Sequence, residues 1–267
     1  MRWFVYDRRV TGQQDASSVD SRAGRWRWLP EGGIPRTLLE IGILIPCYFL
    51  YQAVRGMVSG RSAEAFQRAG KLIDVEQALG IFREAELQSL ILTWDVAVRF
   101  VNFVYLWGHL PVIIVVAVWL FVFHRHRYSL FRNAFIISGG IGLVLFLLLP
   151  TAPPRFLPSW GFVDTVVYDG SYYVLQSPAF VNQYAAIPSL HFGWSLLAAV
   201  AVFVNLRGPY RYLVFMLPVL SLGGVVLTAN HFFLDAVAGA AVALFGLLLA
   251  MIIRARLPRQ RPFTVLA

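Results

Sequence analysis

The chain has 267 residues, of which 58% are hydrophobic and 14% are charged. Soluble domains carry about 45–50% apolar and about 25% charged residues, so this composition excludes a disordered chain, a coiled coil and an ordinary soluble enzyme, and it indicates a membrane protein. The net charge of +9 would suit nucleic acid, but the basic residues stand between long apolar runs. We interpret them as an orientation signal in a lipid bilayer and expect no nucleic-acid partner.

Several apolar stretches approach the roughly 20 residues that a membrane-spanning helix needs. Six are predicted, at 38–58, 96–123, 133–149, 188–206, 212–229 and 232–253. We therefore expect an all-α, polytopic bundle of about six transmembrane helices. The expected regions are an Arg-rich cytoplasmic tail (1–36), a first span with an amphipathic helix (37–92), a transmembrane core (93–253) and a basic cytoplasmic tail (254–267).

Arginines gather on one side of this arrangement. They lie in the N-terminal tail, in the loop 124–132, in the turn near Gly208 and in the C-terminal tail. Because cytoplasmic loops are enriched in Lys and Arg, both termini are predicted to be cytoplasmic in a multi-pass protein of the cell membrane.

Residues 61–92 alternate apolar and charged side chains with a helical period. The pattern predicts an amphipathic helix, broken near Gly80, that lies on the outer membrane surface or caps the bundle. A role in guiding a substrate is an alternative to a plain interfacial helix.

Ionisable groups in spans are costly and tend to be functional, and here they stand at span ends on the predicted outer side. The third span ends in PTAPPR, where prolines stop the helix and hold Arg155 just outside it. Arginine suits bidentate binding of phosphate oxygens, or serves as an interfacial anchor. The fourth span opens with AAIPSLH, where Ser189 fits an N-cap and His191 lies in the first turn. That positive end of a helix suits an anion, and the histidine can exchange protons.

The sixth span opens with NHFFLD, so His231 and Asp235 lie four residues apart on one helix face. The carboxylate can hold one ring nitrogen and leave the other free to attack, and a structural His–Asp pair is the alternative. Two histidines and a carboxylate could also bind zinc or iron. The sequence has no HExxH motif or acidic cluster to support a metal, so we predict neither metal nor cofactor.

These residues resemble the motifs of the type-2 phosphatidic acid phosphatase superfamily. PSLH at 188–191 is similar to its PSGH motif, and the spacing from His231 to Asp235 is similar to the end of its SRxxxxxHxxxD motif. PPR at 153–155 stands where its KxxxxxxRP motif would lie. The resemblance covers roughly residues 95–253.

The sequence also departs from these motifs. Leu190 replaces the glycine of the second motif, Leu148 the lysine of the first, and Gly224 and Val225 the Ser-Arg pair of the third. PTAPPR, AAIPSLH and the Glu-rich amphipathic segment look more like the inositol phosphorylceramide synthase-like (inositolphosphotransferase) branch, whose members move phosphorylated head groups between lipids.

The resemblance implies a role for each matching residue. His231 would attack phosphorus and form a phosphohistidine, Asp235 would orient it, and His191 would exchange a proton with the leaving or accepting oxygen. Arg155 and Ser189 would bind the substrate phosphate. Weaker candidates for head-group contacts are Asn182, Tyr184 and Asn230.

We therefore expect a metal-independent lipid phosphotransferase that acts on a phospholipid or another lipid phosphate, with its active site on the non-cytoplasmic side. The alternatives are a lipid phosphate phosphatase of the phosphatidic acid or polyprenyl phosphate type, and a non-catalytic lipid transporter or binding protein.

Overall fold

The computed structural model describes residues 33–56, 61–166 and 184–256, which form helices and no strand among them. The α-helices are α1 (Gly33–Gly56), α2 (Ser62–Ala78), α3 (Glu84–Ser89), α4 (Asp95–Trp107), α5 (Leu110–Phe123), α6 (Arg125–Leu148), α8 (Leu190–Phe203), α9 (Met216–Leu227) and α10 (Phe233–Arg256). The 3-10 helices are η1 (Pro154–Phe156), η2 (Pro158–Trp160) and η5 (Pro209–Phe215). The tails predicted at 1–36 and 254–267 lie outside the described residues, apart from the first turn of α1 and the end of α10.

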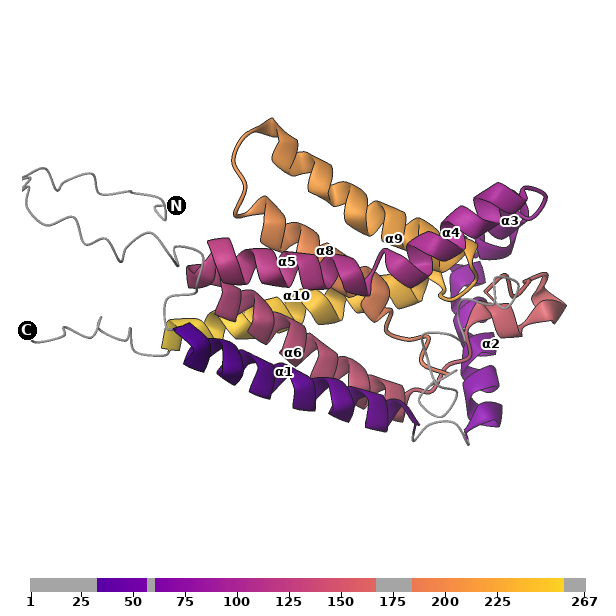
Figure 1. Ribbon diagram of the computed structural model, residues 1–267. Helices are drawn as coiled ribbons and strands as arrows, with labels where there is room; N and C mark the ends of the chain where they lie inside the picture. The colour runs from indigo at the N-terminus through magenta and orange to yellow at the C-terminus, as the bar shows by residue number, and fades with distance from the viewer. Residues whose placement is uncertain (1–32, 57–60, 167–183, 257–267) are drawn as a thin grey trace, which may run out of the picture.

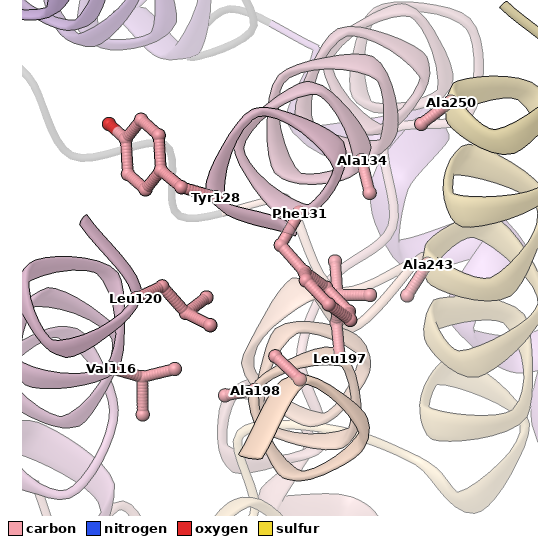
Figure 2. Close-up of a cluster of buried hydrophobic side chains, with 10 residues drawn as sticks. Val116, Leu120, Tyr128, Phe131, Ala134, Leu197, Ala198, Ala243 and Ala250 are labelled. Carbon is pink, nitrogen blue, oxygen red and sulfur yellow. The ribbon is translucent and has the colours of Figure 1, made fainter. Parts of the chain in front are cut away.

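The long helices lie alongside one another, and α10 packs on both α6 and α8 (Figure 1). In the same view α2 crosses the end of the bundle at which α10 begins. The core of the bundle joins α5, α6, α8 and α10. Figure 2 shows Phe131 of α6 pointing toward Leu197 of α8, with Ala243 and Ala250 of α10 on the facing side.

Small residues let α10 approach its neighbours closely. A Cβ atom added to Gly239 of α10 would collide with the carbonyl oxygen of Ser189, and one added to Gly193 of α8 would collide with the carbonyl oxygen of Gly239. On the other side, a Cβ at Gly246 would come within 2.9 Å of the carbonyl oxygen of Ala134 in α6. Close backbone approach of this kind is typical of helices packed in membranes, where van der Waals contact drives association.

The structure supports a membrane protein but does not confirm six spans. Three helical segments are long and apolar enough to cross a membrane: Arg125–Leu148, Pro209–Leu227 and Phe233–Arg256. The predicted span 96–123 is two helices, α4 and α5, bent by 43°, and it becomes a fourth span if the bent pair is counted as one.

The other two predicted spans contain shorter apolar helical stretches, although α1 as a whole has 24 residues. Their apolar helical parts are Thr37–Leu50 in α1 and Leu190–Phe203 in α8. The 14 residues of α8 rise roughly 21 Å, less than the roughly 30 Å of a hydrocarbon core. A full span at 188–206 is therefore not confirmed, because Pro188 precedes the helix and the helix ends at Phe203.

The predicted loop 124–132 is also mostly helical, because α6 begins at Arg125 rather than near residue 133. Arg132 lies inside this helix and pairs with Glu40 of α1, with Nη1 2.6 Å from Oε1. Tyr128 donates a hydrogen bond to the same carboxylate at 3.3 Å. The basic residues here therefore also dock α1 on α6.

The amphipathic segment forms two helices, α2 and α3, separated by a turn in which Gly80 has φ +70°. Its break near Gly80 is confirmed. The buried face of α2 packs on residues that follow α6 and α9, including Ala152, Phe162 and Phe232. The segment thus caps the end of the bundle.

The glycine contacts predict that a methyl group added at Gly239 destabilises the protein, whereas one added at Gly140 does not. Gly239→Ala is expected to push α10 away from the start of α8 and to cost about 1–3 kcal/mol of stability, as overpacked cores do. Thermal unfolding of the purified protein in detergent should show a melting temperature several degrees below that of the wild type. Gly140→Ala in α6 is the control, since nothing lies within 4 Å of its added Cβ. Equal melting temperatures for the two variants would contradict the close approach.

Candidate active site

Three chain segments meet where α2 covers the bundle. They are the turn after α6, the start of α8 and the start of α10, and Figure 1 shows this end of the bundle opposite the end at which α10 finishes. The turn after α6 pairs with the approach to α8, because Thr151 donates to the Tyr184 carbonyl at 2.8 Å and accepts from Ala186 N at 3.2 Å. Backbone hydrogen bonds therefore hold the segments that carry the predicted site residues.

His231 and Asp235 lie at the start of α10, and both side chains are buried. The distance between His231 Nδ1 and Asp235 Oδ2 is 3.5 Å. A shorter contact of 2.8 Å joins the same Nδ1 to the carbonyl oxygen of Ala186. A carbonyl can only accept, so Nδ1 carries the proton and Nε2 of a neutral ring keeps its lone pair. The sequence could not reveal that a backbone carbonyl, more closely than the carboxylate, fixes this ring nitrogen.

His191 lies in the first turn of α8 and faces the same space. Its ring centroid is 5.8 Å from that of His231. Tyr105 of α4 stacks on the His191 ring with centroids 4.8 Å apart. The structure thus brings the two histidines, which are 40 positions apart in the sequence, to adjacent helix starts.

Ser189 caps α8, as its position before the helix predicts: its Oγ accepts a hydrogen bond from Phe192 N at 3.4 Å. Its own N–H donates to the carbonyl oxygen of Asp235 at 2.8 Å, which ties the start of α8 to α10. Ser189 is completely buried. Its role in this structure is therefore to join the two helices, and phosphate binding by Ser189 stays a prediction.

Arg155 lies in η1 and is only 8% exposed. Its N–H donates to the carbonyl oxygen of Ala229 at 2.8 Å, so its backbone is fixed against the turn that leads to His231. The guanidinium lies over the ring of Phe156 at 4.8 Å from the centroid, and Nη1 is 3.8 Å from Asp164 Oδ1. The backbone of Arg155 is thus fixed near His231, and a role of its guanidinium in phosphate binding stays a prediction.

The turn between α9 and α10 is strained. Ala229 has φ +53°, a left-handed conformation that costs a residue with a Cβ about 1 kcal/mol and is usually taken by glycine after a helix. Asn230 N and His231 N both donate to the Val225 carbonyl, at 2.9 and 3.1 Å. Strained backbone is often found next to functional residues, because the fold holds them in one geometry. Here the strained residue, Ala229, lies two positions before His231.

The weaker candidates have different positions. Asn182 lies outside the described residues. Tyr184 is half-buried, with its ring between those of Phe66 and Phe156 at centroid distances of 6.1 and 6.4 Å. The amide nitrogen of Asn230 donates to Thr228 Oγ1 at 2.7 Å, which stabilises the turn.

Two buried glutamates complete the start of α10, and the sequence analysis missed them. Leu234 N donates to Glu76 Oε1 at 2.8 Å, and Phe233 N donates to Glu84 Oε1 at 2.9 Å. Both glutamates are 0% exposed. The alternation of apolar and charged residues at 61–92 predicts that glutamates lie on the exposed polar face of the amphipathic segment. The helical period could have identified Glu76, because it continues the buried stripe of Ala65, Ala69 and Ile73.

These glutamates predict a pH dependence of stability. Burial is the largest cause that raises the pKa of Glu76 from 4.5 to about 9, and hydrogen bonding to Glu84 is the second. The folded protein then holds a proton that the unfolded chain releases above pH 4.5, so the free energy of unfolding falls as the pH rises toward 9. Glu76→Gln keeps an acceptor for Leu234 and carries no charge. This variant should lose less stability than the wild type when the pH is raised from neutral to above 9, measured by thermal unfolding.

Glu86→Gln is the matched control, because Glu86 is exposed and pairs with Arg83 at 3.0 Å. It should keep the wild-type loss of stability at alkaline pH. The same alkaline loss in Glu76→Gln as in the wild type would show that Glu76 holds no proton in the folded protein.

No curated protein and no solved structure matches the chain. A family model, described as the PAP2 superfamily, matches residues 70–249. The match runs from the middle of α2 into α10 and contains Arg155, His191, His231 and Asp235. Since it covers more than half of the chain, this protein belongs to the PAP2 superfamily, whose members are phosphatases and phosphotransferases.

Proposed function

We propose that the protein is an integral-membrane lipid phosphotransferase that moves a phosphorylated head group between lipids through a phosphohistidine on His231. The observation that carries this proposal is the His231 ring, fixed at Nδ1 by the Ala186 carbonyl and facing His191 at a centroid distance of 5.8 Å. His191, His231 and Arg155 belong to segments that are joined around the start of α10, so their side chains can act on the same phosphoryl group.

In the first step, Nε2 of His231 attacks phosphorus and the bond from phosphorus to the leaving oxygen breaks. The leaving oxygen takes a proton from the imidazolium of His191. Asp235 Oδ2, 3.5 Å from Nδ1, stabilises the positive charge that develops on the attacking ring. Arg155 balances charge on the phosphoryl oxygens.

In the second step, the oxygen of an acceptor alcohol attacks the phosphorus of the phosphohistidine. The acceptor hydroxyl gives its proton to His191, which is neutral after the first step. The phosphorus–nitrogen bond breaks, and its electron pair returns to Nε2 of His231. Both histidines are then in their starting states, so the cycle needs no cofactor.

This chain has uncharged residues at the positions where the superfamily motifs carry further cations, and their absence favours a phosphodiester substrate. Leu148 stands at the end of α6 and is 60% exposed, while Gly224 and Val225 are buried in α9. None of these residues can bind phosphate through a positive charge. A phosphodiester carries less charge than a monoester dianion and needs fewer cations. This supports head-group transfer, with phosphoinositol as a candidate head group as in the inositol phosphorylceramide synthase-like branch.

The charge distribution supports an active site on the non-cytoplasmic side. The described arginines remote from the site lie around the α5–α6 junction, the α8–α9 connection and the end of α10: Arg125, Arg127, Arg132, Arg207, Arg211, Arg254 and Arg256. By the positive-inside rule this end of the bundle faces the cytoplasm. Arg155 and the two histidines then face the opposite side, where a lipid head group is accessible.

Lipid transfer by the purified protein tests the proposal. The protein in detergent is given phosphatidic acid, phosphatidylinositol, diacylglycerol and ceramide, and all lipids and free phosphate are measured by mass spectrometry. We expect a new phosphorylated lipid with the wild type and at least a 1,000-fold slower reaction with His231→Ala, on the order of the loss seen when a catalytic nucleophile is removed.

His124→Ala is the control for the loss of a histidine, since His124 lies at the other end of α5 with its ring 4.3 Å from that of Trp119. Free phosphate as the sole product would show a lipid phosphatase. No turnover of any lipid phosphate would favour a lipid transporter or binding protein.

Inhibitors test the chemistry separately. Vanadate mimics a five-coordinate phosphoryl group, so it should bind between His191 and His231 and inhibit competitively with the donor lipid. A chelator should leave the rate unchanged, because the two histidines, Asp235 and Arg155 supply the charge needed. Loss of activity with the chelator, restored by zinc or iron, would contradict the metal-independent mechanism.

A further inference from the structure

A third histidine lies beside the two candidate catalytic histidines. His109 stands at the break between α4 and α5, where the predicted second span bends by 43°. Gly108 precedes it, and a Cβ at Gly108 would collide with the carbonyl oxygen of Val104. The glycine therefore permits the tight turn that presents His109 at the break.

The ring of His109 contacts the ring of His191, with centroids 4.3 Å apart and planes tilted by 38°. Tyr105, one helical turn earlier, stacks on the same His191 ring. Both contacts come from the α4–α5 pair, so this bent segment forms one wall beside His191. The direct ring contact of His109 is with the proposed acid, His191.

Packing alone does not account for a histidine at this position. The Nδ1 atom of His109 is buried, and among the described residues nothing forms a hydrogen bond with it. The ring of Trp194 lies nearly parallel at 6.0 Å, so the surroundings are aromatic and would accept phenylalanine. A buried polar atom without a partner destabilises a protein by about 1–3 kcal/mol, and such atoms call for a functional explanation.

We propose that His109 is a substrate-contacting residue of the phosphotransfer site, and that its Nδ1–H donates a hydrogen bond to the alcohol oxygen that exchanges a proton with His191. This inference rests on the proposed function. In the first step that oxygen belongs to the leaving group, and in the second step to the acceptor. His109 holds the oxygen next to the His191 ring and undergoes no net change of protonation. It thereby contributes to the choice of acceptor.

His109→Phe tests the proposal, because phenylalanine keeps an aromatic ring against His191 and removes both ring nitrogens. The probes are short-chain phosphatidylinositol with ceramide, and short-chain phosphatidic acid with water. We expect kcat/KM to fall about 10- to 100-fold with the probe that the wild type turns over, the loss of one hydrogen bond to a charged reacting group. The melting temperature should be at least that of the wild type, because the variant no longer buries a polar atom without a partner. His124→Phe, at the far end of α5, should keep wild-type kinetics.

A second pair of variants separates hydrogen bonding from packing. Asparagine and leucine have similar sizes, and the amide of asparagine can replace Nδ1 as a hydrogen-bonding group. His109→Asn should therefore retain at least about 10-fold more activity than His109→Leu. Equal kinetics of these two variants, or wild-type kinetics of His109→Phe, would overturn the role of His109 while the proposed function stands. A wild type that turns over neither probe would instead contradict the proposed function.

Discussion

The start of α10 depends on three carboxylates that come from three different helices. Consecutive N–H groups of Phe232, Phe233 and Leu234 donate to Asp235, Glu84 and Glu76, at 2.9, 2.9 and 2.8 Å. The first N–H groups of a helix have no partner inside the helix, and acidic groups suit its positive end. Because Glu76 and Glu84 belong to α2 and α3, these bonds also attach the amphipathic segment to the helix that carries Asp235. The cap of the bundle and the position of the His231–Asp235 pair therefore depend on the same set of hydrogen bonds.

This arrangement explains why the candidate site is built from two helix starts that differ in function. The positive end of α10 is occupied by the protein's own carboxylates, so it is not open to a phosphate. The start of α8 is joined to α10 through the bond from Ser189 N to the Asp235 carbonyl, and the absence of a side chain at Gly239 permits that approach. His191 is thereby held opposite His231. Arg155 is attached to the same region, because its backbone N–H is bonded to the carbonyl of Ala229 in the strained turn.

Much of this organisation could be predicted from sequence, and the failures have physical causes. Apolar runs identified the helices of the bundle. The spacing of His231 and Asp235 predicted that they lie close together, and their side chains are 3.5 Å apart, although His231 stands in the turn before α10. Six full spans are not confirmed, and hydropathy alone cannot show that α8 contains only 14 residues or that α4 and α5 bend. The local pattern does not identify Glu76 and Glu84 as buried, because their partners are backbone N–H groups more than 140 positions away in the sequence. The same holds for His109, whose neighbour His191 is 82 positions further along the chain.

The charges around the site bear on the substrate it can hold. Glu76, Glu84 and Asp235 are buried together at the start of α10, and Asp164 lies 3.8 Å from the guanidinium of Arg155. Each of these carboxylates, when ionised, disfavours a second negative charge on a bound phosphoryl group, and the effect is stronger in a buried site than in water. The proton that Glu76 holds, with its pKa raised to about 9, removes one of these charges at neutral pH. This charge distribution supports the phosphodiester substrate that we propose, which carries one negative charge, over a dianionic monoester. The acidic cap that fixes α10 thus also favours the head-group transfer proposed for the two histidines.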